Sequence, residues 1–236
     1  MQYMGQPLRH EIKYYINQSV YHTLRARLRT VLNPDENMTK PEGYIISSLY
    51  FDDIYHTALQ EKQAGTCFRK KYRMRCYDWS DGLIKLECKR KYGEYISKTS
   101  ATLNRNEYDS IINGDFSFLV KREEKVCQEL LGYHNAHLLK PMVSVEYLRE
   151  AYVAELGNVR ITFDKDISAS IGNFDIFADD YATKRVLEKD MLVLEVKFDE
   201  FIPSYVLDIL RTSMTNKCAI SKYVMCRLDK GRMLYQ

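Results

Sequence analysis

The sequence lacks any strong excess of one charge and any long apolar run. Thirty-five Lys and Arg residues face 32 Asp and Glu residues, which leaves a formal net charge of only +3 over 236 residues. Such a balance does not indicate the broadly basic surface of a nucleic-acid or membrane binder, so an anion site has to come from local arrangement. No stretch approaches the roughly 18 uninterrupted apolar residues of a membrane helix, and residues 1–16 hold no apolar segment of signal-peptide length. We therefore expect a cytoplasmic protein without direct membrane insertion.

Paired cysteines and metal-binding spacings are missing as well. The six cysteines form no CxxC pair and fall mostly in apolar or strand-like segments. In a cytosolic setting this pattern favours reduced, buried thiols over disulfides or zinc. His134 and His137 lie three apart on a predicted helix, but no carboxylate pattern surrounds them, so the surface of a helix explains them better than a metal site does.

No internal repeat, low-complexity linker or break in composition divides the chain. With 45% hydrophobic and 28% charged residues, it has the composition of an ordinary packed globular protein. We therefore expect residues 1–236 to form a single domain.

Alternation of apolar and polar residues predicts many short strands, with helices between some of them. Strands are expected over 10–16, 43–53, 67–78, 83–91, 93–103, 142–153, 158–166, 191–198 and 221–228, with a turn at Asp81-Gly82 between the third and fourth. Helices are expected from Asn17 to Pro34, over 55–65, 104–114 and about 120–138, and after Pro203. At least eight strands without a regular βαβ alternation indicate an α+β fold whose antiparallel sheet closes as a barrel or folds as a sandwich.

Several of these strands carry charges at alternate residues within otherwise apolar runs. The sets are Glu11 with Lys13, Arg73 with Arg75, Glu87 with Lys89 and Lys91, Arg160 with Thr162 and Asp164, and Glu195 with Lys197. Alternate residues of a strand share a face. For any single set, an exposed face with salt bridges is the simpler explanation. Together, they predict the polar inside of a closed barrel, whose crowded cations suit a linear phosphate chain better than a lone carboxylate.

This pattern resembles the VTC-type polyphosphate polymerase domain, a member of the triphosphate tunnel metalloenzymes. The resemblance covers essentially the whole chain, in order: Glu11-Ile12-Lys13-Tyr14, Arg73-Met74-Arg75, Glu87-Cys88-Lys89, Lys98, VEYLREAY with Arg149, VRITFD with Arg160, LEVKF with Glu195 and Lys197, and SKY with Ser221 and Lys222. The chain departs from the ExExK signature of the wider superfamily, because Arg9 stands at its first position and only ExK is present.

The resemblance implies an antiparallel β-barrel of about eight strands that forms a tunnel, with peripheral helices. In such a tunnel, basic side chains hold a nucleoside triphosphate or polyphosphate chain, and Mn²⁺ or Mg²⁺ bridges the phosphates to a glutamate. Carried over to this chain, the metal ligand is Glu195. The predicted catalytic set is Glu11, Lys13, Arg73, Arg75, Glu87 and Lys89. The implied phosphate contacts are Lys13, Arg73, Arg75, Lys89, Lys98, Arg149, Arg160, Lys197, Ser221 and Lys222. Strand alternation places Glu146 on the face opposite Arg149, so Glu146 is left out.

The implied function is ATP-dependent polyphosphate synthesis, in which the end of a growing chain attacks the γ-phosphorus of ATP. That terminal phosphate is already largely ionised near neutral pH, so the reaction needs no strong base. A triphosphatase, in which Glu11, Glu87 or the metal activates water, is an alternative, and so is a non-catalytic polyphosphate-binding module. Nucleic-acid binding through the 19 tyrosines is the least favoured, because tyrosine is also a good strand residue. The expected partners are ATP or another triphosphate and inorganic polyphosphate, without nucleic acid, and any membrane attachment would come from a membrane-bound partner protein.

Overall fold

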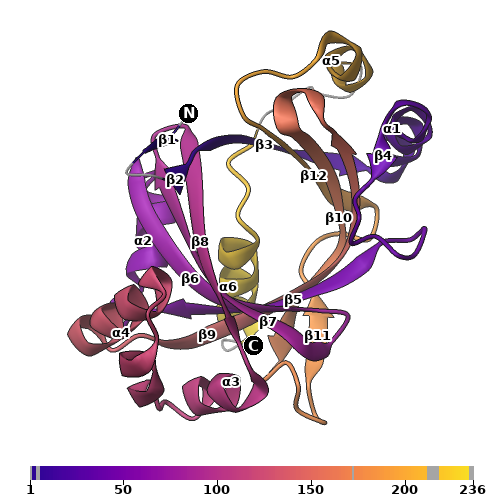
Figure 1. Cartoon of the computed structure of the whole chain (residues 1–236). Coiled ribbons are helices and arrows are strands. Elements are labelled where there is room, and N and C mark those ends of the chain that lie inside the picture. The colour runs from indigo at the N-terminus through magenta and orange to yellow at the C-terminus, as the bar shows by residue number, and fades with distance from the viewer. Residues whose placement is uncertain (1, 4–5, 172, 212–217, 234–236) are drawn as a thin grey trace.

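Eight antiparallel strands pair side by side until they close a ring (Figure 1). The computed structural model describes residues 2–3, 6–171, 173–211 and 218–233. Around the ring the strands are β3 (Arg9–Asn17), β8 (Tyr95–Leu103), β7 (Ser80–Tyr92), β6 (Phe68–Tyr77), β5 (Tyr44–Asp52), β9 (Lys140–Ala154), β10 (Val159–Ile171) and β12 (Met191–Phe198). The ring closes because β12 joins β10 to β3, while β10 also pairs with β9. The predicted α+β fold with a closed antiparallel sheet is confirmed.

The remaining short strands lie beside this ring. They are β1 (Gln2–Tyr3), β2 (Gln6–Pro7), β4 (Asn33–Pro34) and β11 (Ala182–Arg185). β4 adds to β9 and β11 adds to β10, while β1 and β2 pair with each other. The contact between β3 and β8 is the shortest of the ring, with only two residue pairs, Arg9 with Ile96 and His10 with Tyr95.

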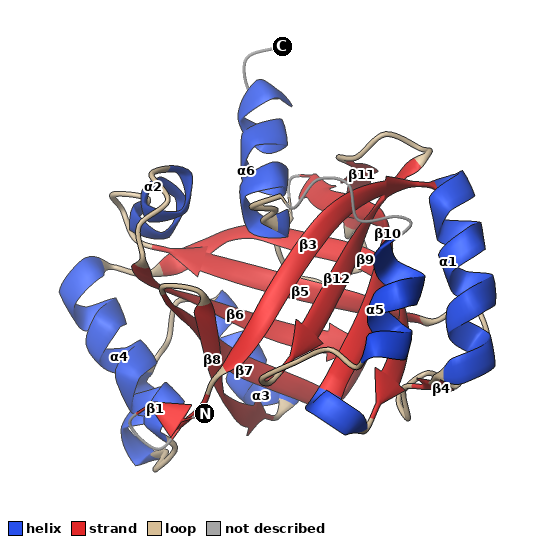
Figure 2. Cartoon of the chain, turned by 90° about the horizontal axis from the view of Figure 1, so that it is seen from above, coloured by secondary structure: helices blue, strands red, loops and turns tan. Residues whose placement is uncertain are grey.

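Most helices lie around the outside of the sheet, whereas the last one lies at one end of the ring (Figure 2). They are α1 (Gln18–Val31), α2 (Thr57–Gln63), α3 (Arg105–Ile112), α4 (Lys125–His137), α5 (Ser204–Arg211) and α6 (Lys222–Met233), with short 3-10 turns η1 (Ser117–Lys121) and η2 (Leu156–Asn158). The side chain of Asn17 caps α1 by accepting a hydrogen bond from the backbone of Val20, which explains why the helix begins there. Across the described residues, every helix is too short or too polar to span a membrane.

The C-terminal segment corrects one prediction, because residues 221–228, expected as a strand, begin helix α6. The hydroxyl of Ser221 accepts a hydrogen bond from the backbone N–H of Val224 at 3.4 Å, as a residue preceding a helix does. Tyr223 and Cys226, three residues apart, are both fully buried, which is a helical spacing. A run of eight residues is too short for its pattern to separate helix from strand, so packing decides.

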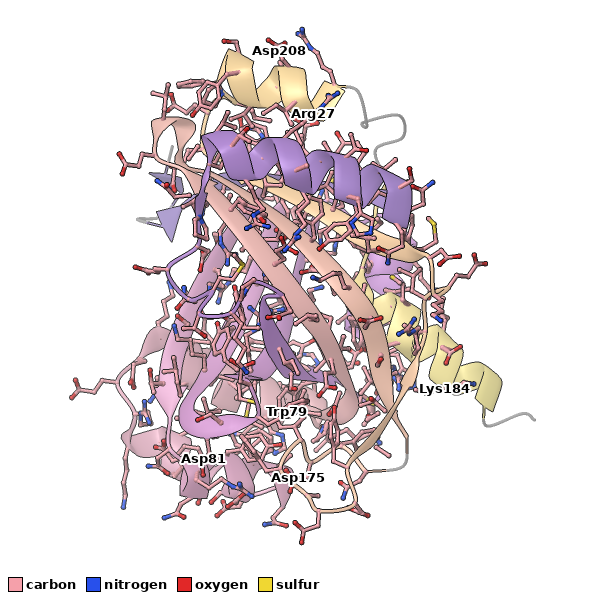
Figure 3. All side chains as sticks on the ribbon, turned by 90° about the vertical axis from the view of Figure 1, so that its right-hand side faces the viewer. Arg27, Trp79, Asp81, Asp175, Lys184 and Asp208 are labelled. Carbon is pink, nitrogen blue, oxygen red and sulfur yellow. The ribbon has the colours of Figure 1, made fainter. Side chains whose placement is uncertain are left out.

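The hairpin between β6 and β7 turns earlier than predicted. Asp78 and Trp79 form the turn, with φ angles of 48° and 55°, whereas Asp81 and Gly82 belong to β7 (Figure 3). In a hairpin with a two-residue loop, two consecutive residues in the left-handed backbone conformation match the twist of the flanking strands. Asp78 is fixed there because its Oδ1 accepts a hydrogen bond from the backbone of Ile45 at 2.8 Å.

Apolar side chains on the outer face of the ring pack beneath the helices. Met74 of β6 lies in one cluster with Tyr108 of α3 and Leu130 of α4. Leu194 of β12 lies in a second cluster with Leu24 of α1. Each fully buried leucine of this kind contributes about 2 kcal/mol of apolar transfer free energy. Because successive side chains of a strand alternate, this outer packing turns the intervening charged residues inward.

Four of the cysteines are buried free thiols, as their apolar surroundings in the sequence favour: Cys76, Cys88, Cys127 and Cys226. Cys67 is exposed. Burial raises the pKa of the Cys127 thiol to about 11, so it stays protonated at neutral pH.

Candidate functional site

Charged side chains gather on the inner side of the ring, and ten basic residues and five carboxylates make up their central cluster. They are Lys13, Lys71, Arg73, Arg75, Lys89, Lys98, Arg149, Arg160, Lys197 and Lys222, with Glu11, Asp35, Glu87, Asp164 and Glu195. If all fifteen are ionised, the difference leaves five positive charges. The carboxylates therefore relieve part of the repulsion between the cations, and a polyanion is the ligand that would neutralise the rest.

The inside of the ring holds two adjoining cavities. The larger, of about 820 Å³, is lined by Arg73, Arg75, Lys98, Arg149, Arg160 and Lys197 among others. The smaller, of about 610 Å³, is lined by Lys13, Lys62, Arg69, Lys71, Lys91 and Ser221 among others. Glu11 and Lys89 line both, so the two cavities meet at these side chains. Along β6, Arg69 belongs to the smaller cavity and Arg75 to the larger, which places the cavities toward opposite ends of that strand.

Glu87 anchors the basic group on β6, β7 and β8. Its side chain is fully buried, and its Oε2 accepts a hydrogen bond from Arg73 Nε at 2.7 Å, while its Oε1 accepts one from Lys98 Nζ at 2.7 Å. Arg75 Nη1 lies 4.0 Å from the same carboxylate. Burial alone would raise the pKa of Glu87, but Arg73, Arg75 and Lys98 outweigh it and hold the pKa well below its usual range. Glu87 is thus a fixed anion that orients two guanidinium groups.

Tyrosine and serine hydroxyls complete the arrangement of these two arginines. Arg73 Nη1 donates to the hydroxyl of Tyr50 at 2.9 Å. Arg75 donates to the hydroxyls of Ser48 and Tyr147, each at 3.3 Å. Each guanidinium is therefore held by groups on several strands, and this fixed orientation suits two-point contacts with phosphate oxygens.

Glu11 and Glu195 form a second group with three lysines, where β3 pairs with β12. Lys13 Nζ lies 2.8 Å from Glu11 Oε1 and 3.2 Å from Glu195 Oε2, and so bridges the two carboxylates. Lys89 Nζ donates to Glu11 Oε1 at 2.7 Å, and Lys197 Nζ lies 2.6 Å from Glu195 Oε1. The register explains this, because Glu195 stands opposite Lys13 and Lys197 stands opposite Glu11.

The charges of this second group shift each other's protonation. Burial and the charge of Glu195 would raise the pKa of Glu11, but Lys13 and Lys89 hold it well below its usual range. Burial lowers the pKa of Lys197 to about 7, despite the opposing effect of Glu195. Lys197 is therefore the cation of this group whose charge changes near neutral pH.

Asp164 holds a third group, on β9, β10 and α6. Arg149 Nε and Nη2 donate to its two oxygens at 2.6 Å and 2.7 Å, a bidentate pair that is almost fully buried. Lys222, at the start of α6, forms an ion pair with the same carboxylate. At the edge of the larger cavity, Arg160 Nε donates to Asp35 Oδ2 at 2.8 Å. The predicted lysine of the SKY motif thus reaches the ring from a helix.

All the residues predicted for the site come together in the ring and its two cavities, although their roles stay predictions. Sequence reasoning missed Lys71 and Asp35 as members of the site, and it named Asp164 among the alternating charges without giving it a role. Lys71 precedes Arg73 by two residues and Asp164 follows Arg160 by four, so strand alternation gave a signal for both. Asp35 lies after β4 in a segment without periodicity and gave none.

Two residues that were set aside have other contacts. Glu146 accepts hydrogen bonds from Ser47 Oγ at 3.0 Å and from Trp79 Nε1 at 2.7 Å, on the outer side of β9 as the alternation predicts. His134 stacks on Phe116 with ring centroids 3.8 Å apart. Neither residue belongs to the inner charge groups.

The surroundings of Glu195 are compatible with a divalent ion whose other ligands are phosphate oxygens. Thr162 stands directly opposite Glu195 in the pairing of β10 with β12, and its buried Oγ1 has no hydrogen-bond partner among the described residues. An unpartnered buried oxygen beside a carboxylate is a ready ligand. The described residues contain no group of three or more His, Cys, Asp or Glu side chains with metal-site geometry. Mg²⁺ commonly binds through one or two protein oxygens with phosphates supplying others, so this small donor set is compatible.

Comparisons with known proteins place the chain by family and by fold. The family model described as the VTC domain matches residues 8–228. Among solved structures, a proposed adenylate cyclase of Bacillus halodurans is 12% identical, covers 92% of this chain and 96% of its own, and has a TM-score of 0.53. A proposed adenylate cyclase of Vibrio parahaemolyticus is 11% identical, covers 93% and 98%, and has a TM-score of 0.48. The capping-enzyme triphosphatase of Mimivirus is 13% identical, covers 89% and 90%, and has a TM-score of 0.40. Among curated proteins, no sequence matches this chain. Identities this low support a shared fold alone, and only the first structure is similar enough for that argument.

Proposed function

We propose that this chain, which belongs to the VTC domain family, is a metal-dependent polyphosphate polymerase that uses ATP. The observation that carries the proposal is the excess of basic side chains over carboxylates in the central cluster, around two adjoining cavities. A single phosphate would leave much of this charge unneutralised, whereas a triphosphate or a longer chain matches it. Resemblance to triphosphate tunnel proteins points to the same ligand.

The larger cavity suits the triphosphate of ATP. Arg73, Arg75, Arg149 and Arg160 line it, and each already has one side fixed by a carboxylate or a hydroxyl. Planar guanidinium groups held in this way bind two oxygens at once and lose little rotamer freedom on binding. The smaller cavity, with Lys13 and further basic residues, suits the growing chain.

Glu195 and Thr162 would hold the divalent metal together with phosphate oxygens. When bound, Mn²⁺ or Mg²⁺ neutralises charge that develops on the phosphates during transfer. Lys13 and Lys197, which now occupy both oxygens of Glu195, then become available to the substrate.

The side chains position the reactants and do not need to remove a proton. A terminal oxygen of the chain forms a bond to the γ-phosphorus, the bond from that phosphorus to the bridging oxygen breaks, and ADP leaves with that electron pair. The ionised chain end needs no base. This agrees with the state of Glu11 and Glu87, both of which are already engaged by cations. The cations lower the barrier by stabilising the charge on the moving phosphoryl group.

The proposal is tested with pure protein, ATP and Mn²⁺, with and without a short polyphosphate primer. Products are separated on a gel stained for polyphosphate, and free phosphate is assayed in parallel. Long chains together with ADP support the polymerase. Free phosphate without chains indicates the triphosphatase instead, and Glu11→Gln then tests whether Glu11 activates the water. Binding of polyphosphate without turnover under any divalent ion indicates a binding module.

A further inference from the structure

Lys71 differs from the other nine basic side chains of the central cluster. Each of the nine has a nitrogen within 4.0 Å of a carboxylate oxygen. The ammonium group of Lys71 lies 5.5 Å from the centre of the Tyr50 ring, and it makes neither an ion pair nor a hydrogen bond with any residue in the described part of the chain. It lines the smaller cavity, next to Lys89, which lines both.

The groups that face Lys71 are mostly cations. Lys89 stands directly opposite it in the pairing of β6 with β7. The charges that act on it are those of Lys89 on β7, Lys13 and Glu11 on β3 and Arg73 on β6 itself, and its ammonium group lies over the Tyr50 ring of β5. The same cavity is also lined by Lys62, Arg69, Lys91, Glu94 and Tyr223. Glu11, the carboxylate that acts on Lys71, is already bound by Lys13 and Lys89. Burial, followed by the charges of Lys89, Lys13 and Arg73, lowers the pKa of Lys71 well below its ordinary value.

We propose that Lys71 is a neutral amine in the empty ring and takes up one proton from solvent when a phosphate oxygen binds beside it. The proton adds to the amine nitrogen, and the resulting ammonium donates a charge-assisted hydrogen bond to the phosphate. The bound chain supplies a negative charge within ion-pair distance of the ammonium group, which no described carboxylate does. Because its ligand is the phosphate chain, this inference rests on the proposed function.

Two consequences follow from a cation that forms only on binding. The empty ring carries one positive charge fewer, which reduces repulsion with Lys89 and Lys13. Binding of the polyanion becomes coupled to proton uptake, so affinity falls as pH rises over the range in which the free ring has lost this proton and the complex keeps it.

The test is calorimetric titration of the protein with sodium tripolyphosphate, without metal, near pH 8. Repeating it in buffers of low and high ionisation enthalpy gives the number of protons taken up on binding. The variants are Lys71→Met, which is never charged, and Lys71→Arg, which is always charged. The matched control is Lys70→Met, because Lys70 also borders the smaller cavity, but its ammonium group already has a partner, 4.2 Å from the centre of the Tyr133 ring.

We expect the wild type and Lys70→Met to take up close to one proton more per tripolyphosphate than either Lys71 variant. Protons taken up by Lys89, Lys197 or the ligand itself contribute to every titration and cancel in the comparison. Lys71→Met should bind at least about tenfold more weakly. Lys71→Arg should bind at least as tightly as the wild type. The melting temperature of ligand-free Lys71→Met should not fall, because no ion pair is lost.

Equal proton uptake in the wild type and both Lys71 variants, with tripolyphosphate bound, would overturn the inference and leave the proposed function standing. No binding of tripolyphosphate by the folded wild type would overturn both.

Discussion

Replacing Glu87 by glutamine should lower stability and raise affinity for phosphate chains at the same time. Glu87 is fully buried and neutralises Arg73 and Lys98 directly, with Arg75 at 4.0 Å. Glutamine has nearly the same volume but no charge, so the cations lose their anion while the packing is kept. A bound polyanion would then supply the missing negative charge.

The expected magnitudes follow from burial of these charges. Removing one partner of a buried ion pair costs about 3 to 5 kcal/mol, which for a chain of this size lowers the melting temperature by roughly 10 °C. A unit charge about 6 Å from a bound phosphate, at an effective dielectric near 20, changes their interaction by about 3 kcal/mol. Allowing for solvent screening, we expect tripolyphosphate to bind about tenfold more tightly to Glu87→Gln.

The pH dependence of stability gives a further signature. The pKa of Glu87 is lower in the folded state, because Arg73, Arg75 and Lys98 outweigh the effect of burial. Its stabilisation is therefore fully present above the unfolded value of about 4.3 and is lost as pH falls from there toward the folded pKa. Glu87→Gln lacks this contribution, so its stability should fall less steeply than that of the wild type when the solution is acidified below pH 5.

The assay is thermal unfolding with and without tripolyphosphate, together with direct titration. Glu150→Gln is the matched control, because Glu150 is also fully buried and bound to Arg25 and Lys165, but on the opposite face of β9 from Arg149. It should lose stability without a change in affinity. Weaker tripolyphosphate binding by a folded Glu87→Gln protein would refute the reasoning, since Glu87 would then support the ligand more than it opposes it.

The remaining predictions concern single residues of the ring. Arg75→Ala should weaken tripolyphosphate binding by about tenfold to a hundredfold in a titration, and unchanged affinity would place Arg75 outside the binding surface. Glu195→Gln should bind Mn²⁺ more weakly in the presence of tripolyphosphate and abolish metal-dependent turnover; normal turnover would contradict its role as ligand. Affinity for tripolyphosphate should fall as pH rises above 7, where Lys197 loses its charge, and Lys197→Arg should reduce that fall because arginine stays ionised. An identical pH profile in both proteins would exclude Lys197 as a source of the effect.

Much of the ring could be predicted because its pattern is local. Arg73, Arg75 and Glu87 alternate with apolar residues along β6 and β7, and the period of two is visible without any knowledge of neighbouring strands. The prediction of a strand over 221–228 was wrong because it also relied on a local pattern alone. These few residues fit the period of a strand and the period of a helix, and only the burial of Tyr223 selects the helix.

The sequence by itself determined which side chains of each strand share a face, and hence that charges would turn to one side. Only the tertiary structure decided that this side is the inside of a ring, and which charge meets which. Glu195 contacts Lys13 because β12 lies beside β3, and Asp35 reaches Arg160 from a loop 125 residues away. Lys71 follows the same alternation as its neighbours in the sequence, yet no described carboxylate lies within ion-pair distance of its ammonium group. Ion pairs depend on strand order and register, which no single strand encodes.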